Sequence, residues 1–501
     1  MDPINPGKVF NDSIHGHVEL HPLLVQIIDT PQFQRLRYIK QLGGGYFVYP
    51  GASHNRFEHS IGVAYLAGLQ AKTLKENQPK LNITDKDILC VEIAGLCHDL
   101  GHGPFSHLFD QMFMPQAHDE DDEDDKERKV QARNKDDKEW RHEDASVEMF
   151  QYLLEKNREL LTEMKNSRLE DNDLVFIKEL ILGEPLKKKS DKPEDPSDWP
   201  YEGRGEDKSF LYEIVSNKQN GIDVDKFDYF ARDCHHLGLK NNFDHMRYFK
   251  FTRVIGVEKN KLKRKHICSR DKEAGNLYDL FYTRDRLHRR AYQHKVTKNV
   301  EIMIKDALLK ANKHIKFKGK DKEKKENFFT ISDAKDNMEA YTQLTDQVTQ
   351  RILESSSSEL EQARNILERI KTRDLYELVD EAKGQNKQHK KISKETITNE
   401  LKVVLPGEVR DHHNDYFEVV LVTYSYGKGD KDPVECSYFY KKDGEPPEAF
   451  QITRQQVSNF LPECFWEQTI RLYWKNKDKT HWHDVAEKFT VWCEHNRFQK
   501  Y

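Results

Sequence analysis

The stretch Ala94–His107, AGLCHDLGHGPFSH, decides how the rest of this sequence is interpreted. It closes an apolar segment with helical spacing and then places three histidines and one aspartate within ten residues. Gly101 and Gly103 must break the helix, so the adjacent pair His98-Asp99 falls where the helix ends. Burying so many polar groups beside an apolar core is costly without a partner, and the stretch therefore indicates a metal site.

Two residues far along the chain complete this pattern. His59 lies in a helix predicted over Asn55–Glu76, and Asp225 lies in one predicted from about Asp223 to His236. Two neutral imidazoles and two carboxylates can bind a transition metal, with water completing the shell. A single histidine on a helix is more often a surface or a satisfied core residue, so the combination carries the prediction.

Three groups of charged and aromatic residues suit a phosphorylated ligand. Arg56 precedes His59 by one helical turn, and its guanidinium fits a phosphate. Asp225, Tyr229, Arg232 and Asp233 share one helix face that suits a sugar, although a salt-bridged surface face is an equal alternative. The third group can bind polyphosphate, RNA or an acidic protein face, or can simply be solvated; it comprises Arg284, Arg289, Arg290, Tyr292, Gln293, His294 and Lys295.

Composition excludes several classes of protein. The chain has 501 residues and 26 Phe, 21 Tyr and 6 Trp, enough aromatic side chains for a sizeable core. The net charge of −5 gives no global attraction to nucleic acid. We expect no membrane span, because no apolar run approaches about 18 residues, and no signal peptide at the start. The 7 cysteines are scattered without CxxC pairs, which favours a reducing compartment over secretion.

Helical periodicity dominates up to about residue 390 and β-rich sequence follows. Helices are predicted over Ile88–Asp99 with a capping box at Thr84, over Asn276–His314 as one helix or two in line, over Met338–Ile352 and over Leu360–Asp380. Tyr416–Tyr424 and Glu435–Tyr440 are predicted to form a hairpin, followed by helices over Gln455–Trp474 and Trp482–Cys493. Charge-rich stretches near 118–138, over Leu186–Asp207 and over Lys316–Asn327 are predicted to be surface loops. The prediction is a mostly α protein, with one domain over 1–390 and an α+β lobe over 391–501 that serves regulation or oligomerisation.

Four long segments then identify a family. Ile28–Ser60, Ala94–His107, Asn220–Gly238 and Leu287–Val296 resemble the SAM-and-HD-domain deoxynucleoside triphosphate triphosphohydrolases of animals, within the HD metal-dependent phosphohydrolase superfamily. The resemblance implies an HD-domain helical core and hydrolysis of a dNTP to the deoxynucleoside and inorganic triphosphate. This chain has no room for the N-terminal SAM domain, so we expect a shortened chain or a natural member without it. The acidic run near 118–138 resembles an insert.

The resemblance also assigns roles to residues. It implies that His59, His98, Asp99 and Asp225 bind the metal, and that His107 and His142 perform acid–base chemistry with support from His102 and Asp110. Substrate contacts are implied for Gln41, Leu42, Arg56, Asp223, Lys226, Tyr229, Asp233, Arg284, Tyr292 and Gln293. A regulatory guanine nucleotide is implied at Lys8, Val9, Asn11, Asp29, Gln34 and Arg37. A second regulatory nucleotide is implied at Val48, Arg247, Arg270, Lys272, Asn276, Arg290, His294 and Lys295, with Lys475 as a weaker match.

Cofactors, partners and setting follow from the same resemblance. We expect zinc or iron at the HD site, Mg²⁺ with the nucleotides, and GTP and a dNTP as activators of a homotetramer. Family members are often nuclear, so we expect a nuclear or cytoplasmic location. The resemblance also implies control of dNTP pools, with an antiviral role in innate immunity. One alternative is another HD-type phosphohydrolase acting on a monophosphate or cyclic nucleotide, which would need no triphosphate clamp. The other alternative is a single-stranded nucleic-acid-binding protein with a vestigial metal site.

Overall fold

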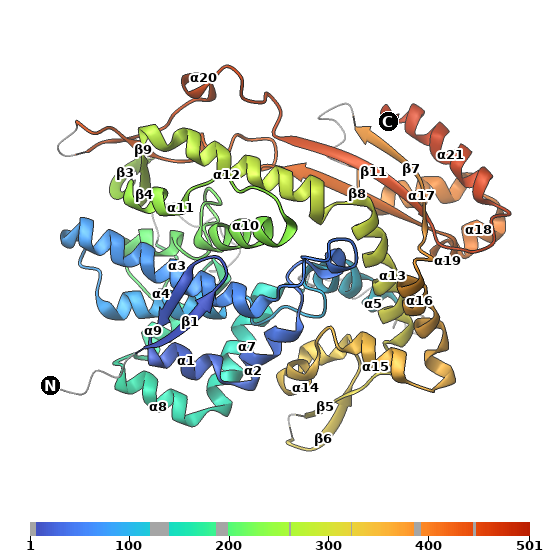
Figure 1. Cartoon of the computed structure of the whole chain (residues 1–501), viewed down its shortest axis with the longest axis horizontal. Helices are drawn as coiled ribbons and strands as arrows, with labels where there is room; N and C mark the ends of the chain where they lie inside the picture. Colours follow the sequence, from blue (N-terminus) through green and yellow to red (C-terminus); the bar gives the residue numbers. More distant parts are fainter. Residues whose placement is uncertain are drawn as a thin grey trace.

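The computed structural model describes residues 7–120, 140–186, 199–259, 262–321, 323–384, 392–443 and 447–500. It shows a large helical body with a four-stranded sheet at one end (Figure 1). The prediction of a mostly α protein with a smaller sheet-containing C-terminal region is confirmed. The predicted acidic insert near 118–138 lies almost wholly outside the described residues, as does most of the Leu186–Asp207 loop.

The first half of the body is built on two buried helices that pack against each other, α3 and α4. The capping box predicted at Thr84 is present, with Asp87 as its partner, and it starts α4. The elements are β1 (Lys8–Asp12), β2 (Gly16–Leu20), α1 (Pro22–Ile28), α2 (Pro31–Gln34), α3 (Arg56–Asn77), α4 (Asp85–Cys97), α5 (Met114–Glu120), α7 (His142–Lys156), α8 (Arg158–Asn166), α9 (Asp171–Leu182), α10 (Val224–Leu237) and α11 (His245–Lys250). Helix α10 packs across α3, so the predicted metal ligands on these helices come together.

The second half of the body contains a broken helix. The segment predicted as one helix or two in line over Asn276–His314 forms two helices, separated by a π-helical turn, η7 (His288–Tyr292). The loop predicted over Lys316–Asn327 instead forms an antiparallel hairpin. The elements are α12 (Ala274–Leu287), α13 (Lys295–Ala311), β5 (Phe317–Lys320), β6 (Glu326–Phe329), α14 (Met338–Gln343), α15 (Val348–Glu354) and α16 (Glu361–Thr372).

The C-terminal sheet has the antiparallel order β12-β7-β11-β8 and packs against short helices. Two predictions are wrong here. The segment predicted as a helix over Gln455–Trp474 contains at its end the central strand β11 (Trp466–Trp474). The helix predicted over Leu360–Asp380 stops at Thr372. Short apolar runs fit a helix or a buried strand equally well, and strand partners distant in sequence decide between them. The elements are β7 (Glu377–Gly384), α17 (Lys394–Val404), α18 (Gly407–Asp411), α19 (His413–Tyr416), β8 (Phe417–Ser425), β11 (Trp466–Trp474), α21 (Trp482–His495) and β12 (Phe498–Lys500).

A second sheet joins the C-terminal part of the chain to the helical body. Its order is β10-β9-β4-β3, with β3 (Thr252–Lys259), β4 (Leu262–Arg270), β9 (Phe439–Tyr440) and β10 (Ala449–Phe450). The predicted hairpin of Tyr416–Tyr424 with Glu435–Tyr440 is therefore wrong, because β9 pairs with β4 and β10 instead of β8. The segment after β10 includes α20 (Arg454–Val457), at the top of Figure 1. The division at residue 390 stays a prediction, although β7 precedes it.

None of the helices in the described part of the chain combines the length and apolar character needed to cross a membrane.

Candidate active site

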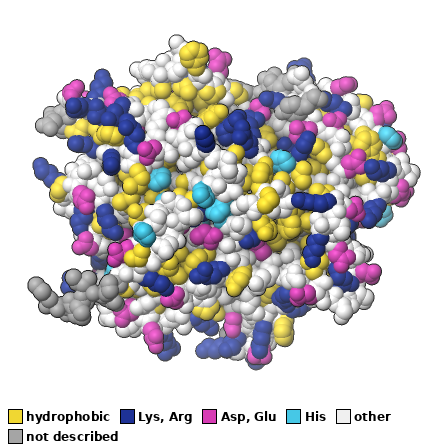
Figure 2. All heavy atoms as spheres, viewed as in Figure 1, with side chains coloured by type: hydrophobic (Ala, Val, Ile, Leu, Met, Phe, Trp, Pro, Cys, Tyr) yellow, Lys and Arg dark blue, Asp and Glu magenta, His cyan; other side chains and the backbone are white. Residues whose placement is uncertain are grey.

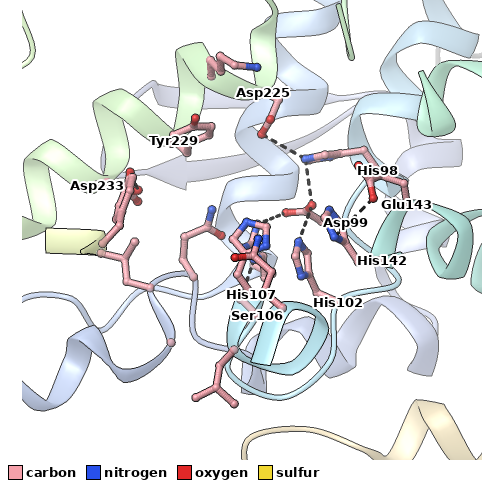
Figure 3. A pocket seen from close by; sticks show the side chains of 18 of the residues that line it. His98, Asp99, His102, Ser106, His107, His142, Glu143, Asp225, Tyr229 and Asp233 are labelled. Atoms are coloured by element: carbon pink, nitrogen blue, oxygen red, sulfur yellow. Dashed lines mark hydrogen bonds and ion pairs between the residues drawn. The ribbon is translucent and has the colours of Figure 1, made fainter. Parts of the chain in front are cut away.

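A cavity of about 410 Å³ opens between the loop after α4, the start of α7, helix α10 and the α12–α13 junction (Figure 3). Every residue predicted to hold substrate lines it: Gln41, Leu42, Arg56, Asp223, Lys226, Tyr229, Asp233, Arg284, Tyr292 and Gln293. The predicted ligands His98, Asp99 and Asp225 and the acid–base residues His102, His107 and His142 also line it. His59 and Asp110 are buried directly behind its wall.

The predicted metal ligands converge on one point. His59 Nε2 lies 3.1 Å from Asp225 Oδ1 and 3.5 Å from Asp99 Oδ2. His98 Nε2 lies 3.4 Å from Asp99 Oδ1 and also 3.4 Å from Asp225 Oδ1. One ligand atom each from His59, His98 and Asp225 falls within 4.8 Å of the others. Helix α3, the end of α4 and the distant helix α10 thus present a set of nitrogen and oxygen donors typical of a divalent transition metal.

The histidines of this cluster are arranged as metal ligands. His59 Nδ1 bonds Asp228 Oδ2 at 2.7 Å, and His98 Nδ1 donates to the Gly95 carbonyl at 2.7 Å. Both Nε2 atoms are buried and have no hydrogen-bond partner within the described part of the chain. Because an Nδ1 that bonds an acceptor leaves the Nε2 lone pair available, these residues fit a bound cation.

Electrostatics support the same interpretation. Burial lowers the pKa of His59, but the carboxylates of Asp225, Asp228 and Asp99 outweigh burial and raise that pKa to about 10. Burial also opposes ionisation of Asp99, yet the Arg56 guanidinium and the neighbouring imidazoles hold the pKa of Asp99 well below its usual range. The site therefore concentrates negative charge that a proton or a metal cation neutralises.

A second group of titratable residues lies beside the metal candidates. Asp110 Oδ2 contacts His142 Nδ1 at 2.7 Å and His107 Nδ1 at 3.3 Å, and the His142 ring stacks on His102 with centroids 3.9 Å apart. Burial lowers the pKa of His142, but the hydrogen bond to Asp110 outweighs burial and raises it. Burial, Arg56 and His142 push the pKa of His102 well below its usual range. One imidazole is thus suited to hold a proton while its stacked neighbour stays neutral.

Gly101 allows these imidazoles to meet. A Cβ at this position would lie 2.3 Å from both the His142 carbonyl oxygen and the Ser146 nitrogen, so only glycine lets the loop after α4 contact the start of α7. The Gly101 N–H also donates to Ser146 Oγ at 2.9 Å. The glycine seen in the sequence as a helix breaker therefore also brings α7 to the site.

The turn before His107 is strained and held from several sides. Phe105 and Ser106 both adopt left-handed backbone angles, with φ of 60° and 58°, which are unfavourable for residues other than glycine. The Phe105 N–H donates to the half-buried Asp346 at 2.6 Å, and Ser106 Oγ accepts from Arg56 Nε at 2.9 Å. These bonds offset the strain and place His107 at the cavity, where its side chain is 53% exposed.

The cavity wall opposite the imidazoles is shaped by the π-helical turn η7. This turn ends at Tyr292, and a π-helical turn within an α-helix often marks a functional site. The Tyr292 hydroxyl donates to Asp233, whose other carboxylate oxygen contacts His54 Nε2 at 2.7 Å. Asp233 and Tyr229 come from α10 and lie opposite the imidazoles (Figure 3). The aromatic rings and Asp233 thus have fixed positions against which a sugar can be held.

At the start of α10, two residues that are predicted to contact the substrate pair with each other. Asp223 caps the helix, and its carboxylate accepts from Lys226 Nζ at 3.0 and 3.1 Å. Burial raises the pKa of Asp223. The Lys226 ammonium faces the cavity and can exchange this carboxylate for a phosphate.

The structure moves one predicted residue out of the site and adds several residues to it. The sequence predicts Arg232 on the same helix face as Asp225, but Arg232 does not line the cavity and donates to Asp228 twice, each time at 2.9 Å. Asp228, which orients His59, was missed, although its spacing of three residues after Asp225 in the same helix was visible. Arg35 was also missed; it donates to the carbonyls of Leu100 and His102 and so supports the loop after α4. Further cavity residues missed were Glu143, His288 and Lys298.

None of the residues predicted to bind regulatory nucleotides lines the cavity, although Arg290, His294 and Lys295 lie within three residues of the lining pair Tyr292 and Gln293. Lys8, Val9 and Asn11 are exposed on β1. Asp29, Gln34 and Arg37 surround α2, where Arg37 Nε donates to Gln34 Oε1 at 2.8 Å. Arg247 and Lys272 both lie over the Phe251 ring, beside Arg270 and Asn276, and His294 contacts Tyr49 next to Val48. Lys475 differs, because its ammonium pairs with Asp306 at 2.7 Å and its side chain is 9% exposed.

This fold and site define the class as an HD-domain metal-dependent hydrolase. The HD domain family profile matches residues 56–195. The chain belongs to the family of the deoxynucleoside triphosphate triphosphohydrolase SAMHD1. It is 50% identical to that protein of Mus musculus over 98% of this chain and 72% of the mouse protein, and 50% identical to that of Homo sapiens over 99% and 75%. A homologue of Dictyostelium discoideum is 35% identical over 94% of this chain and 78% of the homologue.

Proposed function

We propose that this enzyme hydrolyses deoxynucleoside triphosphates to the deoxynucleoside and inorganic triphosphate. The observation that carries the proposal is a single cavity that combines the HD ligand cluster, a histidine–aspartate acid–base group and a wall of cations and aromatic rings. The activity in the names of its relatives, at 50% identity over nearly the whole chain, supports the same reaction.

The residues divide the chemistry between them. A divalent cation at His59, His98, Asp99 and Asp225, for which we propose zinc or iron, supplies Lewis-acid activation of water and of the α-phosphate when bound. Arg56 Nη1 contacts Asp99 Oδ2 at 2.7 Å and also faces the cavity, so its charge stabilises the negative charge that develops on the phosphate.

Proton transfer is assigned to the second group. His107 and His142 share the carboxylate of Asp110, which orients both rings. Because the pKa of His142 is raised, this group favours holding a proton and can supply it to the leaving 5′-oxygen. Burial opposes ionisation of Asp110, but the two imidazoles hold its pKa well below the usual range, so it remains an acceptor.

Substrate is held by the opposite wall. Lys226 and Arg284 supply charge for the triphosphate, and Mg²⁺ is proposed to accompany the nucleotide. Tyr292, fixed by its bond to Asp233, and Leu42 border the space for the sugar. A 2′-hydroxyl placed there without a partner would cost about 1–3 kcal/mol, which favours the deoxyribose.

We further propose that GTP and a dNTP activate the enzyme by joining subunits into a homotetramer. The support is positional: the guanine-site candidates on β1 and around α2, and the cations around Phe251, lie apart from the catalytic cavity. Such an enzyme would control dNTP pools, and depletion of these pools is the proposed route to an antiviral role. A nuclear location remains a prediction.

A second candidate function, binding of single-stranded nucleic acid, is favoured by a groove beside β3, β4 and β9. Its lining combines aromatic rings with cations, the combination that binds single strands: Lys250, Phe251, Arg253, Arg270, Tyr440, Lys441 and Lys442. Lys and Arg gather over this end of the molecule (upper left of Figure 2). Fluorescence anisotropy of a labelled RNA oligonucleotide, with and without Lys441→Glu, separates this candidate from catalysis, which that substitution should leave intact in basal assays.

The decisive experiment identifies the products formed from dGTP with and without GTP. Inorganic triphosphate and deoxyguanosine are expected in equal amounts. Release of pyrophosphate or orthophosphate instead would indicate a different HD-type phosphohydrolase, and inactivity of the metal-loaded enzyme towards all dNTPs would contradict the proposal.

A further inference from the structure

The metal-ligand candidate His59 is oriented by a buried carboxylate that has several other contacts. Asp228 Oδ2 bonds His59 Nδ1 at 2.7 Å and accepts from Arg232 Nε at 2.9 Å. Its other oxygen, Oδ1, accepts from Arg232 Nη2 at 2.9 Å and contacts His15 Nε2 at 2.7 Å. The side chains of His15 and Asp228 are only 3% and 0% exposed. Asp228 is therefore a hydrogen-bond acceptor in a fixed position, shared by the ligand candidate His59 and by His15. His15 lies more than 40 positions before His59 in the sequence.

His15 reaches this carboxylate from the turn between β1 and β2. Asp12 builds the turn, because its Oδ1 accepts the N–H groups of Ile14 and His15 at 2.8 and 2.9 Å. Asp12 Oδ2 pairs with Arg232 Nη1 at 3.0 Å, so the turn is linked to α10 through two residues. The His15 ring also packs against Tyr65 of α3. The hairpin turn is thus inserted between the two helices that carry His59 and Asp225.

The sequence of α3 leaves space for this arrangement. Gly62 lies three residues after His59, on the same face of the helix. A Cβ at position 62 would lie 1.9 Å from Asp228 Oδ1 and 2.6 Å from Arg232 Nη2. Glycine within a helix costs about 1 kcal/mol relative to alanine, and here it allows the carboxylate to approach.

We propose that His15, with Asp12, is a positioning residue for the catalytic metal, acting through Asp228 on His59. This inference rests on the proposed assignment of His59 as a ligand. A carboxylate that orients a ligating histidine fixes the ring and increases its basicity. Removing His15 leaves Asp228 Oδ1 with one donor fewer, so the carboxylate can turn and the lone pair of His59 Nε2 no longer points at the other ligands.

The test measures binding of Co²⁺ to metal-depleted enzyme, by its visible absorption and by competition with a chelator. His15→Ala is expected to weaken Co²⁺ affinity by roughly 10–100-fold and to change the absorption spectrum, because supporting residues have effects of that size. His15→Gln retains a donor and is expected to recover much of both. His17→Ala, an exposed histidine of the same hairpin, is the matched control and should resemble the parent.

Each outcome decides a separate point. Melting temperatures establish that the variants fold, and if His15→Ala does not, Asp12→Asn replaces it, because it preserves the turn acceptor and removes the pairing with Arg232. Parent affinity and an unchanged spectrum in whichever of these variants folds would overturn the role of the hairpin. A parent enzyme that binds no Co²⁺ would overturn the proposed metal centre itself.

Discussion

At the scale of single residues, the metal-ligand candidates His59, His98 and Asp99 are each positioned by a second contact within the protein. His98 is oriented by a carbonyl of its own helix, whereas His59 is oriented by Asp228 of another helix. Asp99 is shared between Arg56 and the ligand cluster. Exchanging one of these residues therefore changes both the charge and the geometry of the cluster.

His98→Ala or Asp99→Ala is expected to abolish dNTP hydrolysis. The same substitution should also cause loss of the tightly bound metal. The effect should exceed the roughly 10–100-fold cost of a supporting residue, because a donor atom itself is removed. Metal content by elemental analysis and turnover of dGTP are measured together, with His314→Ala as a control at a partly exposed histidine. Full metal content and full turnover in the double variant would eliminate the HD assignment.

Metal retention should also depend on pH. The neighbouring carboxylates raise the pKa of metal-free His59 to about 10, so protons compete with the metal for this nitrogen and competition increases as pH falls. We expect metal content after dialysis against a chelator to decline progressively below neutral pH. Retention that does not change between pH 8 and pH 5 would contradict ligation by His59.

Discrimination against ribonucleotides is expected to depend on the volume of the Tyr292 ring. GTP should not be turned over appreciably by the parent, and Tyr292→Ala should raise the ratio of GTP to dGTP turnover, since space for a 2′-hydroxyl is created. Tyr292→Phe keeps the ring and loses the bond to Asp233, so its ratio should stay near that of the parent. Comparable kcat/KM values for GTP and dGTP in the parent would disprove the proposed steric selection.

At the scale of elements, the loop after α4 holds its shape through residues that are distant in sequence. Asp346, just before α15, accepts the N–H of Lys40 at 2.9 Å and that of the strained Phe105 at 2.6 Å. Burial raises the pKa of Asp346 to about 7, in spite of these two bonds. The loop after α4 is therefore supported by a carboxyl group whose ionisation is unfavourable in the folded protein.

This pKa predicts how stability changes with pH. Because the folded state holds the Asp346 proton up to about pH 7 and the unfolded state releases it near pH 4, this residue lowers stability as pH rises between those values. Asp346→Asn cannot ionise but loses one acceptor, at a cost of about 1–3 kcal/mol. The melting temperature of the variant should lie below that of the parent at pH 4–5, and the gap should narrow towards pH 7. A constant gap across this range would refute the raised pKa.

At the scale of the whole molecule, the N-terminal hairpin and the C-terminal sheet are both connected to the catalytic body. The strand β1 carries Lys8, Val9 and Asn11, and the turn that follows it contacts Asp228. In the C-terminal part, Lys475 pairs with Asp306 of α13, which also accepts from Tyr376 at 2.9 Å. A nucleotide or subunit bound at either place would act on elements that support the cavity.

Nucleotide-driven assembly is the prediction at this scale. Sedimentation of the protein alone, with GTP, and with GTP and a dNTP should show growth in mass together with specific activity, because a triphosphate between subunits neutralises cations that otherwise repel. Asp29→Ala removes the acceptor proposed for the guanine edge and should respond weakly to GTP. Equal mass and activity under all conditions, or a parental response of Asp29→Ala, would refute the regulatory assignment and leave the catalytic one.

Much of the site was predictable from the sequence, because its chemistry is concentrated in short segments. The adjacent pair His98-Asp99, the glycines after it and Arg56 one turn before His59 are local patterns, and helices α3, α4 and α10 follow from local periodicity and capping. Local patterns depend on neighbouring residues along the chain, and this dependence is visible in the sequence. The match of longer segments to a known family added the roles of residues such as His142 and Tyr292.

Tertiary structure alone decided the pairings over long distances. Whether Trp466–Trp474 became a helix or a strand depended on β7 and β8, and β9 joined β4 instead of its neighbour β8. The contacts of Asp228 with His15 and of Asp346 with Phe105 join segments separated by more than 200 residues. A buried carboxylate is stabilised by whichever donors the fold brings to it, so its partners follow from packing in space and not from spacing along the chain.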